Sequence, residues 1–289
     1  MKVKIQQGKL EKFNCDLLVV KWVQGQKMDG STGAVDKALH GVLGKMMKEQ
    51  GLKGKEGEIM VFPTMGKIVA KKIMVLGLGE QKNVTVDCVR RSAARIVKEA
   101  RRQHAKRVAT ILIGTGTAGI DPFTAAKAMT EGVLLGGYSY NKYKSEEARE
   151  DAVFPSELVI VTAGVHESAA RNPSQPPLNS DATVRSPTET SDLRGGELLK
   201  IKEAERGIKE GELYSQATIF ARELVNEPAS NMVPKNLADV ARSLVSPSPG
   251  LRPSSPSGRG KGEGTIEVKI LNRAQCEKIG MGAYLGVAK

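Results

Sequence analysis

The residues best suited to bind a small ligand form a glycine-rich run near the middle of the chain. Gly114, Gly116 and Gly119 have the spacing GxGxxG, between an apolar run that predicts a strand and a pattern that predicts a helix. In that context the motif can hold a dinucleotide pyrophosphate at a helix N-terminus. The ribose contact needs an acid at the end of a second strand about 20 residues further on. Because Glu131 falls inside the helical pattern instead, we favour a plain glycine-rich turn.

A second candidate is a set of basic residues on a predicted helix that follows Thr85. Its polar side and the residues just after it carry Arg90, Arg91, Arg95, Lys98, Arg101, Arg102, Lys106 and Arg107. Such a stripe can neutralise phosphates and give salt-dependent binding of nucleic acid. Within the run only Glu99 offsets the positive charge. No base-reading motif accompanies the stripe, so the simpler interpretation is a solvated face or a subunit contact.

Residues that bind metals or act as nucleophiles are dispersed along the chain. The histidines and cysteines are His40, His104, His166, Cys15, Cys88 and Cys276. Their spacing excludes an HExxH zinc site and a CxxC site. Asp29, Asp36 and Asp87 are explained by turns and helix starts. There is no GxSxG elbow and no GxxxxGK[ST] loop, so the predicted set of catalytic, cofactor-binding and metal-ligating residues is empty.

The composition is that of a globular protein with a basic balance. The 289 residues are 40% hydrophobic and 26% charged, and 44 Lys and Arg against 32 Asp and Glu give a net charge of +12. This excludes wholesale disorder and leaves anionic partners possible. No apolar run approaches the ~20 residues of a membrane helix, and the N-terminus lacks the apolar segment of a secretory signal. We therefore expect a cytoplasmic protein without a membrane partner, with reduced cysteines.

An alternation of strands and helices positions these candidates. Apolar, β-branched runs predict strands at 3–5, 17–23, 59–62, 73–78, 108–113 and 158–162. Helical patterns begin at Ser31 or Thr32, extending through Met46, and again at Thr85 and near Asp121. This rhythm predicts an α/β fold with a largely parallel or mixed sheet.

The second half of the chain is interrupted by low-complexity sequence. Between two such stretches a long helix is predicted over 197–225, with one apolar stripe at Ile201, Ala204 and Ile208. A phase slip near Gly211 separates it from a second stripe at Ala217, Ala221 and Leu224. Pro228 ends this helix, and Pro234 opens another. A strand at 266–270 and a short helix at 273–279 follow.

We divide the chain accordingly. The predicted segments are an α/β domain at 1–165, a disordered linker or insertion at 166–196, a linker helix and entry to a further domain at 197–245, a low-complexity stretch at 246–264, and the start of a further α/β domain at 265–289. The last segment should be poorly packed, because its apolar residues lack a covering sheet. Limited proteolysis is expected to cut within 166–195 and after Val245.

Five blocks of sequence, in order, carry a family resemblance. They are VDKAL at 35–39 with GLKGKEGE at 51–58, KIMVLGLG at 72–79, EGVLLGGYSYNKYK at 131–144, ARELVNEPA at 221–229 with Met232, Pro234 and Leu237, and IGMGAYLGVA at 279–288. Together they resemble the leucyl (cytosol) aminopeptidase family. The resemblance implies a macrodomain-like N-terminal domain with a mixed sheet, a long linker helix and an incomplete C-terminal α/β catalytic domain.

The same resemblance implies an activity and the groups that support it. The family removes N-terminal residues, often leucine, from peptides with two divalent cations (Zn, Mn or Mg) that activate a water, and its members are typically hexamers. The family's metal-binding lysine, aspartates and glutamate, and its catalytic arginine, lie beyond the last matching block. The Gly-Lys-Gly at 260–262 is not the family's lysine motif. No site residue is therefore carried over, and we expect the chain alone to be inactive, with peptide substrate bound only where the catalytic part is present.

Two other functions remain open. The first domain could be a binding module for a nucleotide-type ligand or nucleic acid, which a gel shift at two salt concentrations would test. It could instead join full-length subunits in a homo-oligomer, which co-elution at hexamer size would test.

Overall fold

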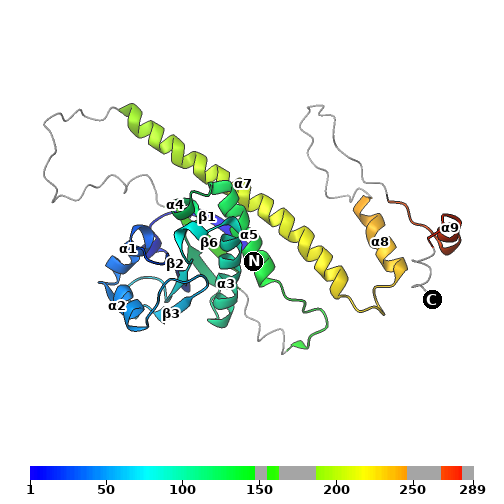
Figure 1. The fold of residues 1–289 in the computed structure, drawn as a ribbon, viewed down its shortest axis with the longest axis horizontal. Helices are drawn as coiled ribbons and strands as arrows, with labels where there is room; N and C mark the ends of the chain where they lie inside the picture. The colour runs from blue at the N-terminus through cyan, green and yellow to red at the C-terminus, as the bar shows by residue number, and fades with distance from the viewer. Residues whose placement is uncertain (147–154, 163–186, 246–267, 282–289) are drawn as a thin grey trace. The chain divides into compact units, whose positions relative to one another are not determined.

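The computed structural model describes residues 1–146, 155–162, 187–245 and 268–281 (Figure 1). The chain forms two compact units, Met1–Ala221 and Arg222–Lys289. In the described residues, no helix combines the length and the apolar character needed to cross a membrane.

The first unit is built on a mixed sheet with the strand order β1-β6-β5-β2-β4-β3. The strands are β1 (Lys2–Gln7), β2 (Leu17–Trp22), β3 (Ile59–Pro63), β4 (Lys72–Gly77), β5 (Arg107–Thr110) and β6 (Glu157–Thr162). Only the β3–β4 pair is antiparallel among the described pairings. These six strands and the mixed sheet confirm the predicted fold class, although β5 ends three residues before the predicted position 113.

Helices cover both faces of this sheet (Figure 1). They are α1 (Gly30–Ala38), α2 (Val42–Glu49), α3 (Val86–Arg102), α4 (Thr115–Ala118) and α5 (Pro122–Gly137), with single 3-10 turns at η1 (Leu10–Lys12) and η2 (Gln81–Asn83). The long helix α7 (Pro187–Asn226) packs on α5 and runs from the first unit into the second.

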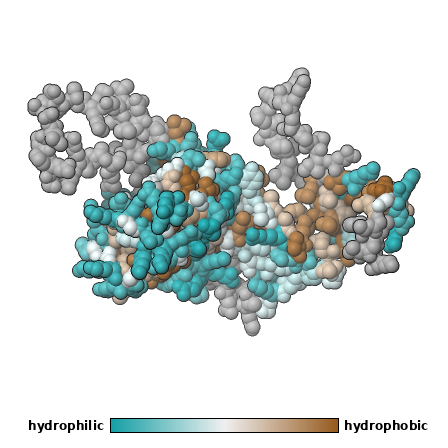
Figure 2. Space-filling view, in the orientation of Figure 1, coloured by the Kyte–Doolittle hydropathy of each residue, from teal (hydrophilic) through white to brown (hydrophobic). Residues whose placement is uncertain are grey.

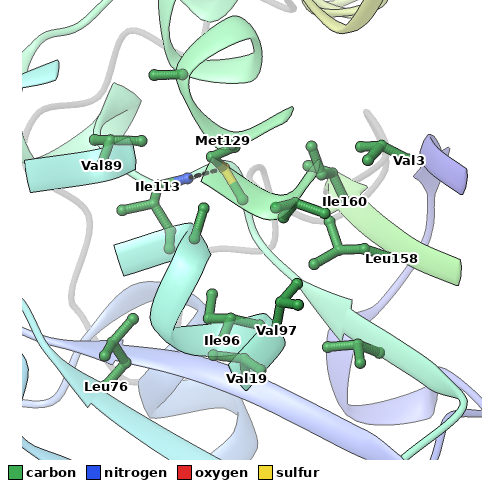
Figure 3. Close-up of a cluster of buried hydrophobic side chains, with 14 of the residues drawn as sticks. Val3, Val19, Leu76, Val89, Ile96, Val97, Ile113, Met129, Leu158 and Ile160 are labelled. Carbon is green, nitrogen blue, oxygen red and sulfur yellow. Dashed lines mark hydrogen bonds between the residues drawn. The ribbon is translucent and has the colours of Figure 1, made fainter. Parts of the chain in front are cut away.

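The side chains of β2 alternate between two cores, as the pleat of a strand requires. Leu17 and Val19 enter the core that α3 and α5 cover, whereas Leu18 and Val20 enter the core beneath α1 and α2. Figure 3 shows the first of these cores, where the backbone N–H of Ile113 donates to the Met129 sulfur at 3.3 Å. Burial on both faces explains the continuous apolar run that predicted this strand.

The helix predicted from Ser31 or Thr32 to Met46 is in fact two helices. His40 (φ 56°) and Gly41 (φ 75°) adopt the left-handed conformation, which ends α1 before α2 begins. Asp29 occupies the position before α1. Thr32 does not cap the helix, because its hydroxyl donates to the Lys21 carbonyl of β2 at 2.8 Å.

The other two predicted helix starts are confirmed by their caps. The Thr85 hydroxyl accepts from the N–H of Cys88 at 3.2 Å, and the Asp121 carboxylate accepts from the N–H of Thr124 at 2.9 Å. Pro122 occupies the first turn of α5, where its missing N–H costs nothing.

The long helix differs from its prediction at one end. It begins at Pro187 rather than at 197, and it ends at Asn226, before Pro228, as predicted. Residues 166–186 of the predicted linker, and 246–264, lie outside the described residues.

The described part of the second unit contains α8 (Pro234–Val245) and α9 (Arg273–Lys278), both close to their predicted positions. Asn272 and Gln275 form a reciprocal capping box at the start of α9. The predicted strand at 266–270 is wrong over 268–270, where the backbone has no regular structure, and its first two residues lie outside the described part. A strand needs a neighbour to pair with, and the described residues of this unit form no ladder.

Candidate functional site

The GxGxxG run forms a tight turn after β5. Gly114 (φ 102°) precedes α4, which ends at Gly119 (φ 66°) after a single turn. A Cβ on Gly114 would approach Ile120 at 3.0 Å and Val89 at 3.1 Å. Glycine is therefore required at position 114 both by the backbone conformation and by core packing. This is what the interpretation as a plain glycine-rich turn predicts.

Gly77 and Gly79, at the end of β4, contact the loop that precedes β3. Any Cβ on Gly77 would overlap the Lys55 carbonyl. One Glu58 oxygen accepts three backbone N–H groups in this loop, from Lys53 at 3.0 Å, Gly54 at 2.7 Å and Lys55 at 3.0 Å. The carboxylate therefore fixes the loop and leaves these donors no capacity for a bound anion.

The basic side of α3 is largely paired with acids of the same chain. The pairs are Arg90 with Glu131 at 2.8 Å, Arg91 with Glu56 at 2.9 Å and also with Asp87, Arg95 with Glu56 at 3.5 Å, Arg102 with Glu99 at 2.8 Å, and Arg107 with Glu157 at 3.1 Å. Two of these partners are distant in sequence: Glu56 lies 35 residues from Arg91, and Glu131 lies 41 residues from Arg90. The sequence therefore overstated the charge available on this face for phosphate.

Glu131 is the acid that the dinucleotide interpretation needed. Only 8% of it is exposed, within α5, and it accepts from Arg90 Nε at 2.8 Å. It joins α5 to α3 and lies on no strand end, so it cannot contact a ribose as that motif requires.

The described residues do not fit a metal centre. Among them, no group of three or more His, Cys, Asp and Glu side chains could hold a metal ion. Asp36 accepts from the Gly44 N–H at 3.0 Å, Asp87 pairs with arginines, and Asp29 precedes α1 without a side-chain capping bond. The Gly-Lys-Gly at 260–262 lies outside the described residues.

The described cysteines are buried and free. Burial raises the pKa of the Cys15 thiol to about 12. Burial, and then the nearby Glu56 carboxylate, raise the pKa of Cys88. Both thiols are therefore protonated at neutral pH and lack the thiolate that a nucleophile needs.

The docking of α7 onto α5 depends on Gly207 and Gly211, whose packing role the sequence analysis did not predict. A Cβ on Gly207 would overlap the Phe123 carbonyl, and one on Gly211 would lie 2.8 Å from the Lys127 carbonyl. Lys127 Nζ lies 2.6 Å from Glu210 and 4.2 Å from the centre of the Tyr214 ring. The spacing of these two glycines, four residues apart, could have predicted this contact from the sequence, because it lets two helix backbones approach closely.

Several large apolar side chains are exposed on the later helices of the described residues. Leu237 and Leu244 of α8 are 49% and 65% exposed, and Leu213 of α7 is 63% exposed. In Figure 2 apolar residues gather over α8, whereas the visible face of the sheet and its helices is mostly hydrophilic. The described residues thus form a packed framework, with exposed apolar side chains on α7 and α8.

Comparison with known proteins gives this framework a family. Residues 19–147 match the family described as "Cytosol aminopeptidase family, N-terminal domain". The chain is 31% identical over 290 residues to a probable cytosol aminopeptidase of Alkaliphilus oremlandii, covering 100% of this chain and 48% of that protein. A similar protein of Sulfurihydrogenibium is 28% identical, with 100% and 47% covered. The chain thus spans about half the length of these curated relatives.

Solved structures agree on the fold. A tomato leucine aminopeptidase mutant superposes with a TM-score of 0.67 at 22% identity, over 99% of this chain and 47% of that one. The bottromycin maturation enzyme BotP in complex with Mn gives a TM-score of 0.51 at 21% identity, over 80% and 36%. The family match thus identifies residues 19–147 with the N-terminal domain of the cytosol aminopeptidase family, and the solved structures share the fold of this chain.

Proposed function

We propose that this chain serves as the N-terminal part of a cytoplasmic aminopeptidase that removes N-terminal residues, leucine among them, from peptides. The observation that carries the proposal is the alignment of the whole chain with curated cytosol aminopeptidases about twice its length. In this proposal hydrolysis uses two divalent cations that activate a water, and the structural relative BotP, solved in complex with Mn, supports the use of a divalent metal.

The metal ligands of this activity come from outside the described residues. Within those residues Glu131 and Glu56 pair with arginines, Glu58 binds backbone N–H groups, and no group of three or more His, Cys, Asp and Glu side chains could hold a metal ion. The role proposed for the first unit is therefore structural. It forms a stable folded domain, and it contributes surfaces through which subunits assemble into a homo-oligomer of hexamer size. The chain alone should not hydrolyse peptides.

The test is an assay of the purified 289-residue chain on leucine p-nitroanilide with Mn²⁺, Zn²⁺ or Mg²⁺, beside a full-length family member. We expect activity from the full-length enzyme and none from the chain, while size-exclusion chromatography of the mixture should show both eluting together. Metal-dependent release of leucine by the chain would refute the proposed structural role. Separate elution would refute assembly.

A further inference from the structure

The turn between β3 and β4 exposes a bulky apolar side chain in a conformation that such side chains rarely adopt. Met65 (φ 53°) and Gly66 (φ 75°) are its two central residues, and the Lys67 N–H donates to the Thr64 carbonyl at 3.1 Å. Two successive positive φ angles are typical of a type I′ turn, which favours Asn or Asp before Gly. Methionine is strained in this position. Because it is 82% exposed, burial does not offset the strain.

Hydrogen bonds hold the base of this turn, so that Met65 projects from an ordered loop. Thr64 is only 3% exposed, and its hydroxyl donates to the Ala70 carbonyl at 2.6 Å. Its N–H donates to the Lys71 carbonyl at 3.0 Å. Val69, on the returning arm, is 56% exposed. A strained and exposed apolar side chain on an ordered turn indicates an interaction outside the chain.

The same side of the sheet carries lysines that lack acidic partners. Helices α1 and α2 lie together on this side (Figure 1), over the core that also holds Leu10 and Ala70. Exposed lysines of η1, α1, α2 and the two connections that follow form no ion pair with any described residue; they are Lys12, Lys37, Lys45, Lys48, Lys53 and Lys67. Glu11 and Glu49 offset only part of this charge. We call these lysines, together with Met65 and Val69, the basic hairpin surface.

We propose that the basic hairpin surface binds a lipid bilayer with anionic headgroups, with Met65 inserted at the boundary between headgroups and acyl chains. Burial of the methionine in the bilayer then offsets the strain of the turn. The lysines face the negative headgroups, each contributing favourably to binding. The sequence led us to expect no membrane partner, because it has no spanning segment. Contact at the membrane surface needs none.

The composition of the basic hairpin surface favours a lipid over a macromolecule. Protein interfaces are enriched in aromatic residues and arginine and depleted of lysine, whereas this surface consists of lysines, Met65 and Val69. A nucleic acid would use the lysines, but residues 64–71 contain no aromatic side chain to stack on a base. A nucleic acid would also leave the exposed methionine without a role. The proposal requires neither a metal nor hydrolysis, so its test is separate from that of the aminopeptidase proposal.

The first experiment is co-sedimentation of the full chain with phosphatidylcholine vesicles prepared with and without phosphatidylserine. We expect binding to the vesicles that contain phosphatidylserine and little to the others. Binding should weaken when KCl rises from about 0.1 M to 1 M, because the screening length falls from about 10 Å to 3 Å. Equal binding to both kinds of vesicle would overturn the proposal. So would binding to neither, including the case in which labelled duplex DNA binds instead.

The second experiment separates insertion from folding. Met65→Asn should lower the vesicle partition coefficient by at least about tenfold, because it removes the apolar side chain. The same variant should raise the melting temperature, because asparagine tolerates the left-handed conformation, so loss of binding cannot come from unfolding. Unchanged partitioning of Met65→Asn would contradict insertion of the turn.

A matched pair of lysine variants tests which side of the sheet faces the bilayer. Lys67→Gln should lower the partition coefficient by about fivefold, the effect of one lysine at an anionic surface. Lys98→Gln removes an exposed lysine from α3, on the other side of the sheet, and should bind vesicles like the wild type. Equal losses in the two variants would show attraction by net charge alone and overturn the assigned surface.

Discussion

At the scale of single residues, the carboxylates of the first unit bind the backbone and hold strands together. Asp16 is the clearest case. One of its oxygens accepts from the N–H groups of Lys106 at 3.0 Å and Arg107 at 2.9 Å, and the other lies 2.7 Å from Lys71 Nζ. This one side chain thus joins the starts of three neighbouring strands, β2, β4 and β5.

The charge of Asp16 should therefore contribute to stability. Burial raises the pKa of this carboxyl, but hydrogen bonds from Lys71, Arg107 and Lys106 outweigh burial and hold the pKa below its usual value. The corresponding stability is present above the unfolded pKa of about 3.9. It is lost as pH falls through the lower folded pKa.

We predict that Asp16→Asn lowers the free energy of unfolding at neutral pH by about 1–3 kcal/mol, because it weakens three hydrogen bonds to a charged acceptor. The loss should shrink as pH falls below 4, where the wild type also protonates. Urea denaturation at several pH values measures both effects. Glu49→Gln, at an exposed position of α2, is the control, and an equal loss in that variant would contradict this role for Asp16.

At the scale of elements, close helix packing through glycine organises the side of the sheet that α3, α5 and α7 cover. On α5, Gly132 and Gly136 leave no room for a Cβ against α3, and on α7 Gly207 and Gly211 do the same against α5. At each contact the two helix backbones lie closer together than larger residues would allow. Replacing one of these glycines by a slightly larger residue should therefore lower the free energy of unfolding.

Gly207→Ala should therefore destabilise the chain by about 1–3 kcal/mol, even though alanine is the better helix former. Gln216→Ala, at an exposed position of the same helix, should be neutral or slightly stabilising. Thermal unfolding followed by circular dichroism measures both variants. If Gly207→Ala raised the melting temperature, the docking of α7 on α5 would be wrong.

Sequence patterns predicted the elements well where local chemistry decides them. The sheet strands, the Thr85 and Asp121 caps and the stop before Pro228 all follow from local rules. The break at His40 was missed, because a histidine in the left-handed conformation carries no strong sequence signal. The predicted strand is wrong over 268–270, because alternation alone does not supply a neighbouring strand.

Contacts between residues distant in sequence could not be predicted from the candidate surfaces, for a physical reason. Helix α7 is continuous through the apparent phase slip near Gly211 and has two apolar sides, and only the packing of α5 shows which side is buried. The basic stripe on α3 likewise depended on acids distant in sequence, Glu56 and Glu131. Such contacts are not readable from spacing along the chain.

At the scale of the whole molecule, the positive charge is concentrated in the first half. Residues 1–146 contain 26 Lys and Arg against 13 Asp and Glu, so the net positive charge of this part alone exceeds that of the whole chain. Repulsion within it opposes folding, because like charges come closer together in the compact state.

Salt should therefore stabilise the first unit. Raising the KCl concentration from about 0.01 M to 0.15 M shortens the screening length from about 30 Å to 8 Å. We predict a gain of roughly 1 kcal/mol, equivalent to about 2–4 °C in melting temperature for a unit of this size. A fall in melting temperature would show instead that the α3 ion pairs outweigh the repulsion.

The central claim is that this chain supplies framework and contact surface, while the metal ligands lie outside its described residues. The most direct measurement is isothermal titration of the purified 289-residue chain with Mn²⁺. We predict no saturable heat beyond dilution, because no group of three or more His, Cys, Asp and Glu side chains among the described residues could hold a metal ion. Stoichiometric binding of one or two Mn²⁺ ions per chain would contradict the account and locate a metal centre within these 289 residues.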